Sequence, residues 1–194
     1  MVGRVVASQA ICREHFRLVV AVEGFDASAR PGQFVQVRCG QAVVSGAVVR
    51  EWQDDRPLRL EGVELVGRTA MLRRPLGIAG LWQGRASAVS GWRLAPVYRV
   101  VGPGTSWLSG VGVGDFRDMI GPLGRGCAIR TDRPVAWVVG GGVGLPPLIW
   151  LARVLKQSGR EVVAFVGARS RDLLALTAGL AEGRVGDRLA GSLG

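Results

Sequence analysis

The stretch VAWVVGGGVGLPPLIWLARVLK (Val135–Lys156) has the pattern of a buried strand, a glycine-rich turn and a helix. Its first five residues form a continuous apolar run, which is typical of a strand that is covered on both faces of a sheet. Pro146 and Pro147 stand where the helix begins, and a helix tolerates missing N–H groups in its first turn. Gly159 is expected to end the helix.

A second apolar run, EVVAFV (Glu161–Val166), predicts the next buried strand. The segment GARSRD (Gly167–Asp172) then leads to a second apolar helix, expected near residues 173–180. This order predicts a Rossmann-like α/β lobe over residues 132–194. Because two strands and two helices make a thin sheet, we expect the lobe to be truncated, with its C-terminal part missing.

Residues 1–131 read differently, as short apolar runs separated by turn residues. The runs at 15–22 and 33–38 are strand-like, and the second alternates with period two. Further short strands are expected at 98–101 and 116–120. Many short strands at this spacing predict a β-barrel or a sandwich. Residues 51–67 are charged and weakly patterned, which indicates an inserted surface hairpin or loop.

The formal net charge of +10 over 194 residues raises the question of nucleic-acid binding. A nucleic-acid surface needs its cations gathered on one face, often beside aromatic side chains that stack on bases. Here the arginines are spread along the whole chain, and no block of like charges occurs. We therefore expect no nucleic-acid partner, and the positive charge equally suits an anionic dinucleotide.

The longest apolar stretch, residues 135–151, is interrupted in its middle by glycines and two prolines. Such a segment does not form a continuous membrane-spanning helix. The first ten residues contain no continuous apolar core and no cleavage-site pattern. The sequence therefore predicts a cytoplasmic protein with no membrane partner.

Three cysteines, Cys12, Cys39 and Cys127, lie far apart, and no CxxC pair occurs. This spacing supplies neither a zinc site nor a cysteine loop for an iron–sulfur cluster, so free buried thiols are expected. The single histidine, His15, is expected to be a surface or edge imidazole. Because one histidine and no paired carboxylates cannot build a hydrolytic site, a cofactor would have to supply any chemistry.

Three local motifs could contact an anion, and each also has a purely structural explanation. The turn Gly140–Gly144 either lets a phosphate approach a helix start or is a tight strand–helix connection. Arg74 either holds a pyrophosphate through its guanidinium or is solvated. The segment Gly102–Thr105 starts a helix with Thr105 or Ser106 as its cap, and serves either an anion or simple capping.

Taken together and in order, six motifs resemble a known family. They are PGQF (31–34), RRP (73–75), YRVVGPGTSWLS (98–109), GD with GPLGRG (114–126), VVGGGVGLPPL (138–148) and VGARS (166–170). The chain resembles the electron transfer subunits of type B dihydroorotate dehydrogenase, which belong to the ferredoxin-NADP reductase superfamily. The resemblance implies an FAD-binding β-barrel of the ferredoxin reductase type, followed by a truncated Rossmann-like lobe that binds NAD(H).

The resemblance also implies which residues bind the cofactors. Arg74, Pro75, Leu76 and Gly77 would occupy the Arg-Pro-x-Ser flavin motif, with Gly77 in place of the serine. Tyr98, Arg99 and Val100 would lie along the flavin and its ribityl chain, and Gly104 and Thr105 near the FAD pyrophosphate. Gly140, Gly141, Gly142 and Gly144 would face the nicotinamide nucleotide. No catalytic side chain and no metal ligand is expected.

The implied activity is electron transfer from NADH through the flavin to an iron–sulfur cluster and a partner's flavin in pyrimidine biosynthesis. The partner would be the dihydroorotate dehydrogenase catalytic subunit, in a hetero-oligomer. The cysteines for a 2Fe-2S cluster are absent from this chain. Two alternatives stay open: a flavin subunit of an NADPH–ferredoxin reductase, and a non-catalytic partner-binding barrel that has lost its flavin.

Overall fold

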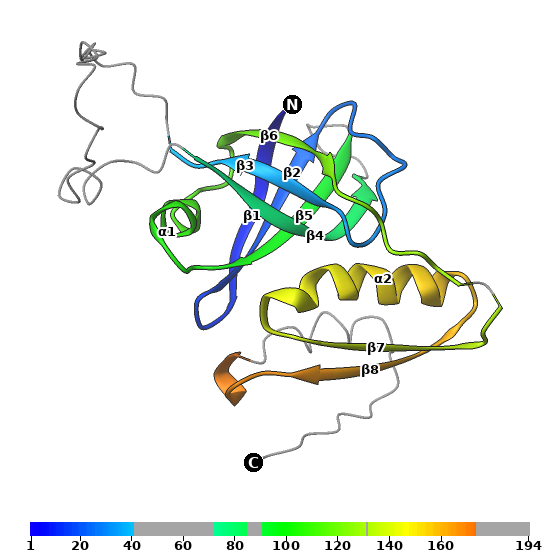
Figure 1. Cartoon of the computed structure of the whole chain (residues 1–194). Coiled ribbons are helices and arrows are strands. Elements are labelled where there is room, and N and C mark those ends of the chain that lie inside the picture. The colour runs from blue at the N-terminus through cyan, green and yellow to red at the C-terminus, as the bar shows by residue number, and fades with distance from the viewer. Residues whose placement is uncertain (41–71, 85–90, 131, 174–194) are drawn as a thin grey trace, which may run out of the picture.

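The computed structural model describes residues 1–40, 72–84, 91–130 and 132–173. Six antiparallel strands close into a barrel in the order β1-β2-β5-β4-β3-β6 (Figure 1). Their bounds are β1 Val2–Cys12, β2 His15–Val22, β3 Phe34–Arg38, β4 Arg73–Gln83, β5 Trp92–Arg99 and β6 Phe116–Leu123. The expected barrel is confirmed, and closure gives each of these strands a partner on both sides.

The period-two pattern of the sequence sets which side of each strand faces the barrel core. In β3, Val35 and Val37 are fully buried, as their alternation predicts. In β4, Leu76 and Ile78 belong to the same core. Arg74 lies on that core-facing side of β4 as well, two residues before Leu76, so its charged side chain sits at the end of an apolar interior.

A short helix, α1 (Pro103–Ser109), lies at one end of the barrel (Figure 1). Its Leu108 is fully buried and packs into the same hydrophobic core as Leu18 and Leu94. The helix therefore closes this end of the barrel with apolar contacts, and holds its own first turn close to the strand ends.

After the barrel, β7 (Val135–Gly141) and β8 (Glu161–Gly167) form a parallel pair in continuous register. Helix α2 (Leu145–Gln157) connects them, with both prolines in its first turn, as the sequence predicts. A short 3-10 turn, η1 (Gly142–Gly144), joins β7 to α2, and another, η2 (Arg171–Leu173), follows β8.

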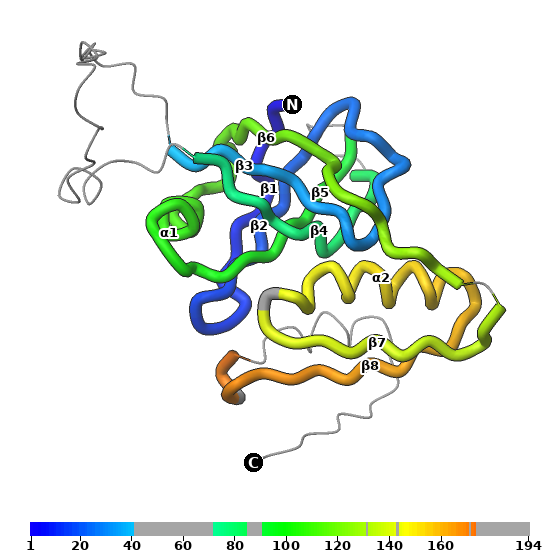
Figure 2. The backbone as a smooth tube through the Cα atoms, viewed as in Figure 1, coloured from blue at the N-terminus to red at the C-terminus, as the bar shows by residue number. Residues whose placement is uncertain are grey.

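Helix α2 lies between the barrel and the two-stranded sheet (Figure 2). Its Ile149, Ala152 and Leu155 form a second hydrophobic cluster, which includes Ala79 and Val97 of the barrel. The lobe is thus packed against the outside of β4 and β5, and the first turn of α2 comes to lie beside the barrel.

The other face of the two-stranded sheet differs from the expectation. Val135, Trp137 and Val139 are 40%, 72% and 69% exposed, whereas Val138 between them is 5% exposed. Trp137 contacts Phe165 of the neighbouring strand, with ring centroids 5.7 Å apart. The apolar run predicted coverage on both faces, but within the described residues only the face toward α2 is covered.

The histidine and the cysteines also correct the sequence analysis. His15 is 4% exposed, and its Nδ1 lies 2.9 Å from the carbonyl oxygen of Arg13 and 3.3 Å from Sγ of Cys12. It is buried because it starts β2 directly after a tight turn, which folds the ring back onto β1. Of the three cysteines, Cys39 is buried, whereas Cys12 and Cys127 are half-buried.

Two sequence predictions fall outside the described residues: the insertion at 51–67, and the helix near 173–180 apart from its first residue. The connection between β6 and β7 contains the expected boundary at residues 131 and 132, and the division into two domains stays a prediction. In the part of the chain that the structure describes, no helix is long and apolar enough to cross a membrane.

Candidate functional site

The first contact of interest joins β4 to the first turn of α1. A Cβ atom built on Gly104 would stand 2.7 Å from Nε and 3.2 Å from Cζ of Arg74. Glycine therefore lets the guanidinium lie against the helix at this point. Nη1 of Arg74 donates a long hydrogen bond of 3.4 Å to the carbonyl of Arg73. Most of the five guanidinium donors are thus unused within the described part of the chain.

Thr105 organises the turn before α1. Its Oγ1 accepts hydrogen bonds from the N–H groups of Val101 (2.9 Å) and Gly102 (3.2 Å), and donates one of 3.1 Å to the carbonyl of Gly102. The expectation that Thr105 or Ser106 caps the helix is wrong, because the helix begins at Pro103 with Gly102 as its cap. Proline is favoured in a first helical turn, so the Gly-Pro pair starts the helix earlier.

The expected flavin motif follows β4, and its side chains alternate between two sides. Leu76 is 4% exposed and points into the barrel core, whereas Pro75 is exposed. A Cβ atom on Gly77 would lie 3.5 Å from Cδ and 3.7 Å from Cγ of Pro147 in α2. Gly77 therefore faces the lobe, next to the helix that follows the glycine-rich turn.

Tyr98 lies inside the barrel. It is 4% exposed, and its ring stacks on Phe16 with centroids 6.0 Å apart. Its hydroxyl is buried and has no hydrogen-bond partner among the described residues. Burial raises the pKa of this hydroxyl above its ordinary value, and the charge of an ionised Cys39 would raise it further.

Arg99 and Val100, which follow Tyr98, have different surroundings. Arg99 forms an ion pair with Glu14, with 2.7 Å between Nη2 and Oε2 and a second hydrogen bond of 2.9 Å from Nε. Val100 is half-buried against the core, and its N–H donates to the carbonyl of Glu14 at 2.7 Å. Because neighbours in a strand point to opposite sides, the side chains of Tyr98 and Arg99 leave β5 on opposite faces.

The glycine-rich turn divides into two parts. A Cβ atom on Gly140 would overlap Cδ1 of Leu148, and one on Gly141 would stand 2.6 Å from the carbonyl oxygen of Gly167. Gly141 is needed for close packing against the backbone of Gly167, and Gly140 leaves room for the Leu148 side chain, which together give the structural explanation of the motif.

Gly142 and Gly144 differ, because no atom of the described residues, apart from those adjacent in the chain or helix, lies within 4 Å of a Cβ built on either. Gly142 has a φ of +53°, which glycine adopts without strain. The N–H of Leu145 is already bonded to the carbonyl of Gly142, and Pro146 and Pro147 have no N–H. This part of the turn therefore offers open space but few hydrogen-bond donors.

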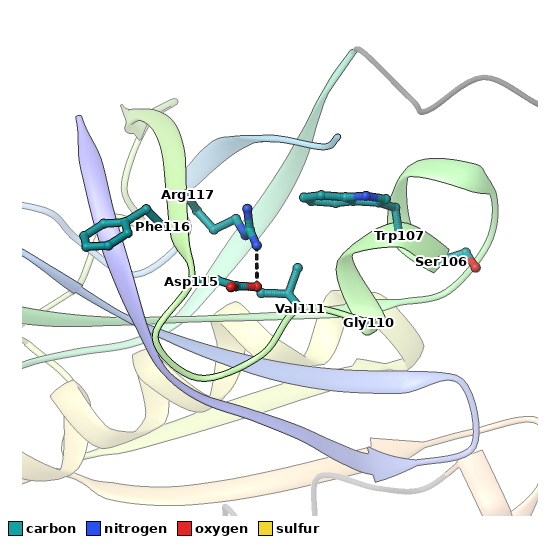
Figure 3. Close-up of a pocket in the computed structure, with 7 residues that line it drawn as sticks. All are labelled: Ser106, Trp107, Gly110, Val111, Asp115, Phe116 and Arg117. Atoms are coloured by element: carbon teal, nitrogen blue, oxygen red, sulfur yellow. Dashed lines mark hydrogen bonds and ion pairs between the residues drawn. The ribbon is translucent and has the colours of Figure 1, made fainter. Parts of the chain in front are cut away.

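A cavity of about 590 Å³ lies between α1 and the beginning of β6 (Figure 3). It is lined by Ser106, Trp107, Gly110, Val111, Asp115, Phe116 and Arg117. No sequence prediction covers it, although Trp107 and Asp115 lie within the motifs that carry the resemblance.

The described residues hold no group of three or more His, Cys, Asp and Glu side chains that could bind a metal ion. Cys12, Cys39 and Cys127 form no disulfide with one another and lie far apart in the sequence. A 2Fe-2S cluster therefore has no ligand set within the residues that the structure describes.

The sequence comparisons agree with the fold. The chain is 31% identical, over 144 residues, to the electron transfer subunit of dihydroorotate dehydrogenase B (NAD(+)) from Fusobacterium nucleatum, a match that covers 73% of this chain and 44% of that one. The subunit from Desulforamulus reducens is 34% identical over 143 residues, 74% of this chain and 43% of that one. This chain is a homologue of those electron transfer subunits.

This chain spans about half the length of the curated relatives it matches. No protein-family model matches it. Among solved structures, the NADH-dependent reduced ferredoxin-NADP oxidoreductase, studied for flavin-based electron bifurcation, is 28% identical with a TM-score of 0.62, over 89% of this chain and 50% of that one. Phthalate dioxygenase reductase has a TM-score of 0.61 at 13% identity, over 97% of this chain and 49% of that one, which shows the fold alone. This chain thus has the ferredoxin reductase fold.

Proposed function

We propose that this chain is the flavin-binding part of an electron transfer subunit. Through FAD it would pass electrons between NAD(H) and a dihydroorotate dehydrogenase catalytic subunit in pyrimidine biosynthesis. The observation that carries the proposal is Arg74, whose guanidinium lies against Gly104 with most of its donors unused among the residues that the structure describes. A guanidinium in this position suits a pyrophosphate, which it can bind through two parallel hydrogen bonds.

The proposed flavin residues follow one another along β4. Arg74 and Gly77 are three residues apart, about 10 Å at the usual rise of a strand. Gly77 faces Pro147 across a gap that an additional Cβ atom would fill without overlap. We propose that the pyrophosphate lies at Arg74, Gly104 and Thr105, and that the flavin ring lies beside Pro75, Leu76 and Gly77.

The remaining expected residues would act less directly. Tyr98 points into the core, so it would support the site through its backbone and through packing. Arg99 would keep its pair with Glu14, and Val100 would hold the strand end in place. Gly142 and Gly144 would give a nicotinamide ring room to approach, while Gly140 and Gly141 keep the turn tight against α2 and β8.

Bound FAD would accept a hydride from NADH and release the two electrons singly. The chain's own contribution is position: α2 sits on β4 at Gly77, so the glycine-rich turn and the flavin motif are held on adjacent elements. Gly77 has no hydroxyl to offer the flavin edge. A 2Fe-2S cluster and the catalytic subunit would complete the relay in the proposed full assembly.

The proposal is tested by titrating the purified apoprotein with FAD and following the quenching of flavin fluorescence. We expect wild-type protein to bind FAD, and Arg74→Ala to weaken binding about 10- to 100-fold, since hydrogen bonds to charged groups are the strong ones. Arg74→Lys should restore only part of the loss, because an ammonium cannot form the two parallel bonds.

Arg133→Ala is the matched control, because it removes the same charge from a side chain that is 73% exposed near β7. It should leave FAD affinity unchanged. Wild-type protein that does not bind FAD would overturn the proposal and favour the non-catalytic barrel. Equal FAD affinities of wild type and Arg74→Ala would show that Arg74 does not bind FAD, and would leave the proposal without its main support.

A second candidate is a flavin subunit of a ferredoxin-NADP reductase, favoured by the 28% identity to the NADH-dependent reduced ferredoxin-NADP oxidoreductase. The two candidates differ in the electron acceptor. The test reduces the flavin of the protein and then measures its reoxidation by each acceptor. Reoxidation by purified dihydroorotate dehydrogenase catalytic subunit supports the first candidate, and reoxidation by ferredoxin alone supports the second.

A further inference from the structure

The turn between β1 and β2 places the only histidine of the chain beside a cysteine. Cys12 and His15 pair across this two-residue turn, and Nδ1 of His15 lies 3.3 Å from Sγ of Cys12. The same nitrogen lies 2.9 Å from the carbonyl oxygen of Arg13. Because a carbonyl oxygen only accepts hydrogen bonds, we assign a hydrogen to Nδ1, and the sulfur lies within reach of that N–H.

The surrounding structure holds the pair in place. His15 is 4% exposed, so its ring is enclosed by the protein. Glu14, in the turn, has a φ of +62°, which is uncommon for a residue other than glycine. The turn keeps this conformation because the carbonyl of Glu14 accepts a 2.7 Å hydrogen bond from the N–H of Val100, and the Glu14 carboxylate pairs with Arg99. The thiol and the imidazole therefore stay together in the folded protein.

The charged side chains near the thiol are paired with one another. Arg13 lies 2.9 Å from Asp172, and Glu14 lies 2.7 Å from Arg99, so each charge of the turn has a partner of opposite sign. The imidazole N–H is then the group that acts directly on the sulfur of Cys12. A donor at the sulfur favours the thiolate over the thiol, and the thiolate is the nucleophile in thiol–disulfide exchange.

The other two cysteines have different surroundings. Cys39 is fully buried, and burial raises the pKa of its thiol. Cys127 is half-buried like Cys12, but its sulfur lies at Gly32, where a Cβ atom would stand 2.8 Å from Sγ. Because the single histidine of the chain lies at Cys12, Cys127 is a matched thiol without an imidazole. Solvent access and a ring N–H at the sulfur thus occur together only at Cys12.

The residues on both sides of Cys12 contact the α/β lobe, whose end lies close to this turn (Figure 1). Ile11 packs against the hydrophobic cluster that the barrel shares with the lobe. Arg13 pairs with Asp172, which follows β8. A group attached to Cys12 would therefore sit between two contacts that hold the lobe to the barrel.

We propose that Cys12 is a site of thiol–disulfide exchange with small-molecule disulfides, and that a group attached there loosens the contact between the turn and the lobe. The Cys12 thiolate attacks one sulfur of the disulfide. A new sulfur–sulfur bond forms at Cys12, the bond within the reagent breaks, and the departing thiolate takes a proton from water. Cys12 is oxidised and the released half of the reagent is reduced, and an added thiol reverses the step.

The test treats folded wild-type protein with glutathione disulfide at pH 7, and follows the modification of each cysteine by peptide mass spectrometry. We expect Cys12 to react about 10-fold faster than Cys127, because the rate follows the thiolate fraction and the access to the sulfur. In urea, where the turn is lost, the two cysteines should react at similar rates. A folded-state rate at Cys12 that is no higher than that at Cys127 would overturn the site.

Variants of His15 test the role of the imidazole. His15→Phe removes the ring N–H and keeps an aromatic side chain, and should slow Cys12 to about the rate of Cys127. His15→Asn supplies an amide N–H near the position of Nδ1, and should restore part of the rate. Cys127→Ser is the control and should leave Cys12 unchanged. Full reactivity of Cys12 in His15→Phe would overturn this role, and the comparison within wild type holds even if that variant does not fold.

The effect on the lobe is measured by hydrogen exchange. Protein modified at Cys12 should exchange faster in β8 (Glu161–Gly167) than Cys12→Ser treated in the same way, while β3 of the barrel should not change. Equal exchange in β8 would overturn the link between Cys12 and the lobe. None of these measurements needs bound flavin, so a chain that does not bind FAD would overturn the proposed function and leave this inference standing.

Discussion

The barrel and the α/β lobe bury their apolar surface in different ways. The barrel closes on itself, and Leu18, Ile78 and Leu94 in its core are fully buried. The described part of the lobe has two strands and one long helix, and it leaves Trp137 and Val139 mostly exposed. Its buried side chains share a cluster with the barrel. The lobe therefore depends on the barrel for its core, while the barrel has a core of its own.

This difference indicates which residues of the candidate site are held most firmly. Arg74, Gly104 and Gly77 are held by barrel strands and by α1, which is anchored through Leu108 in the barrel core. The glycine-rich turn is held by a two-stranded sheet and by α2. The proposed flavin side of the site is thus built on the barrel, which has a core of its own, and the proposed nicotinamide side on the lobe, whose described core is shared with the barrel.

The largest expected effect comes from truncating a core leucine of the barrel. Leu94→Ala removes a fully buried side chain from β5, and should lower the free energy of unfolding by about 2–5 kcal/mol. Leu151→Ala in α2 removes a half-buried side chain, and should cost less than half as much. Urea unfolding followed by circular dichroism measures both. Equal losses would contradict the view that the barrel dominates stability.

A smaller effect is expected within the glycine-rich turn. Gly140→Ala places a Cβ atom against Leu148 and should cost about 1–3 kcal/mol through overpacking. Gly144→Ala meets open space at a φ of −80°, and should be neutral or stabilise by up to about 1 kcal/mol. Thermal unfolding of the two variants is the measurement. The same melting temperature for both would show that Leu148 does not hold the turn tight.

The smallest effect concerns the ion pair of the barrel surface. Arg99 holds the pKa of the Glu14 carboxyl below its ordinary value of 4.5, by a hydrogen bond and by its charge. Because the folded-state pKa is the lower one, the pair stabilises the fold above that ordinary value, and the contribution is lost as the pH falls through the folded-state pKa.

Glu14→Gln should therefore lower the melting temperature slightly at pH 7 and leave it unchanged near pH 2, since exposed pairs contribute little. Glu23→Gln, on an exposed turn, is the control for the loss of a surface carboxylate. A loss that is the same at both pH values would contradict this role of the pair.

Features that depend on neighbours in sequence were predictable. The alternation of Val35 and Val37 fixed which face of β3 is buried, and the prolines marked the first turn of α2. The contact of Arg74 with Gly104 joins residues thirty positions apart in sequence. The local motifs gave each residue a possible anion role, and the resemblance placed Arg74 in the flavin motif and Gly104 near the pyrophosphate. Neither predicted the contact, because it depends on barrel closure.

The misses have the same cause. The cavity formed by Trp107 and Arg117 needs α1 to fold back onto β6, and no local pattern describes that return. His15 is buried by the turn that pairs β2 with β1. The apolar run of β7 gave the strand correctly, but an apolar run does not tell which element covers each face, and Trp137 lies on a face that α2 does not reach.

The spacing at Gly77 also has a genetic consequence. A Cβ atom there would make ordinary van der Waals contact with Pro147, so the fold itself does not exclude a small side chain at this position. Glycine codons of the GGC and GGT type become serine codons through one base substitution. The hydroxyl that the resemblance expects at the flavin edge is therefore a single mutation away, and a lineage can gain or lose it without rebuilding the barrel.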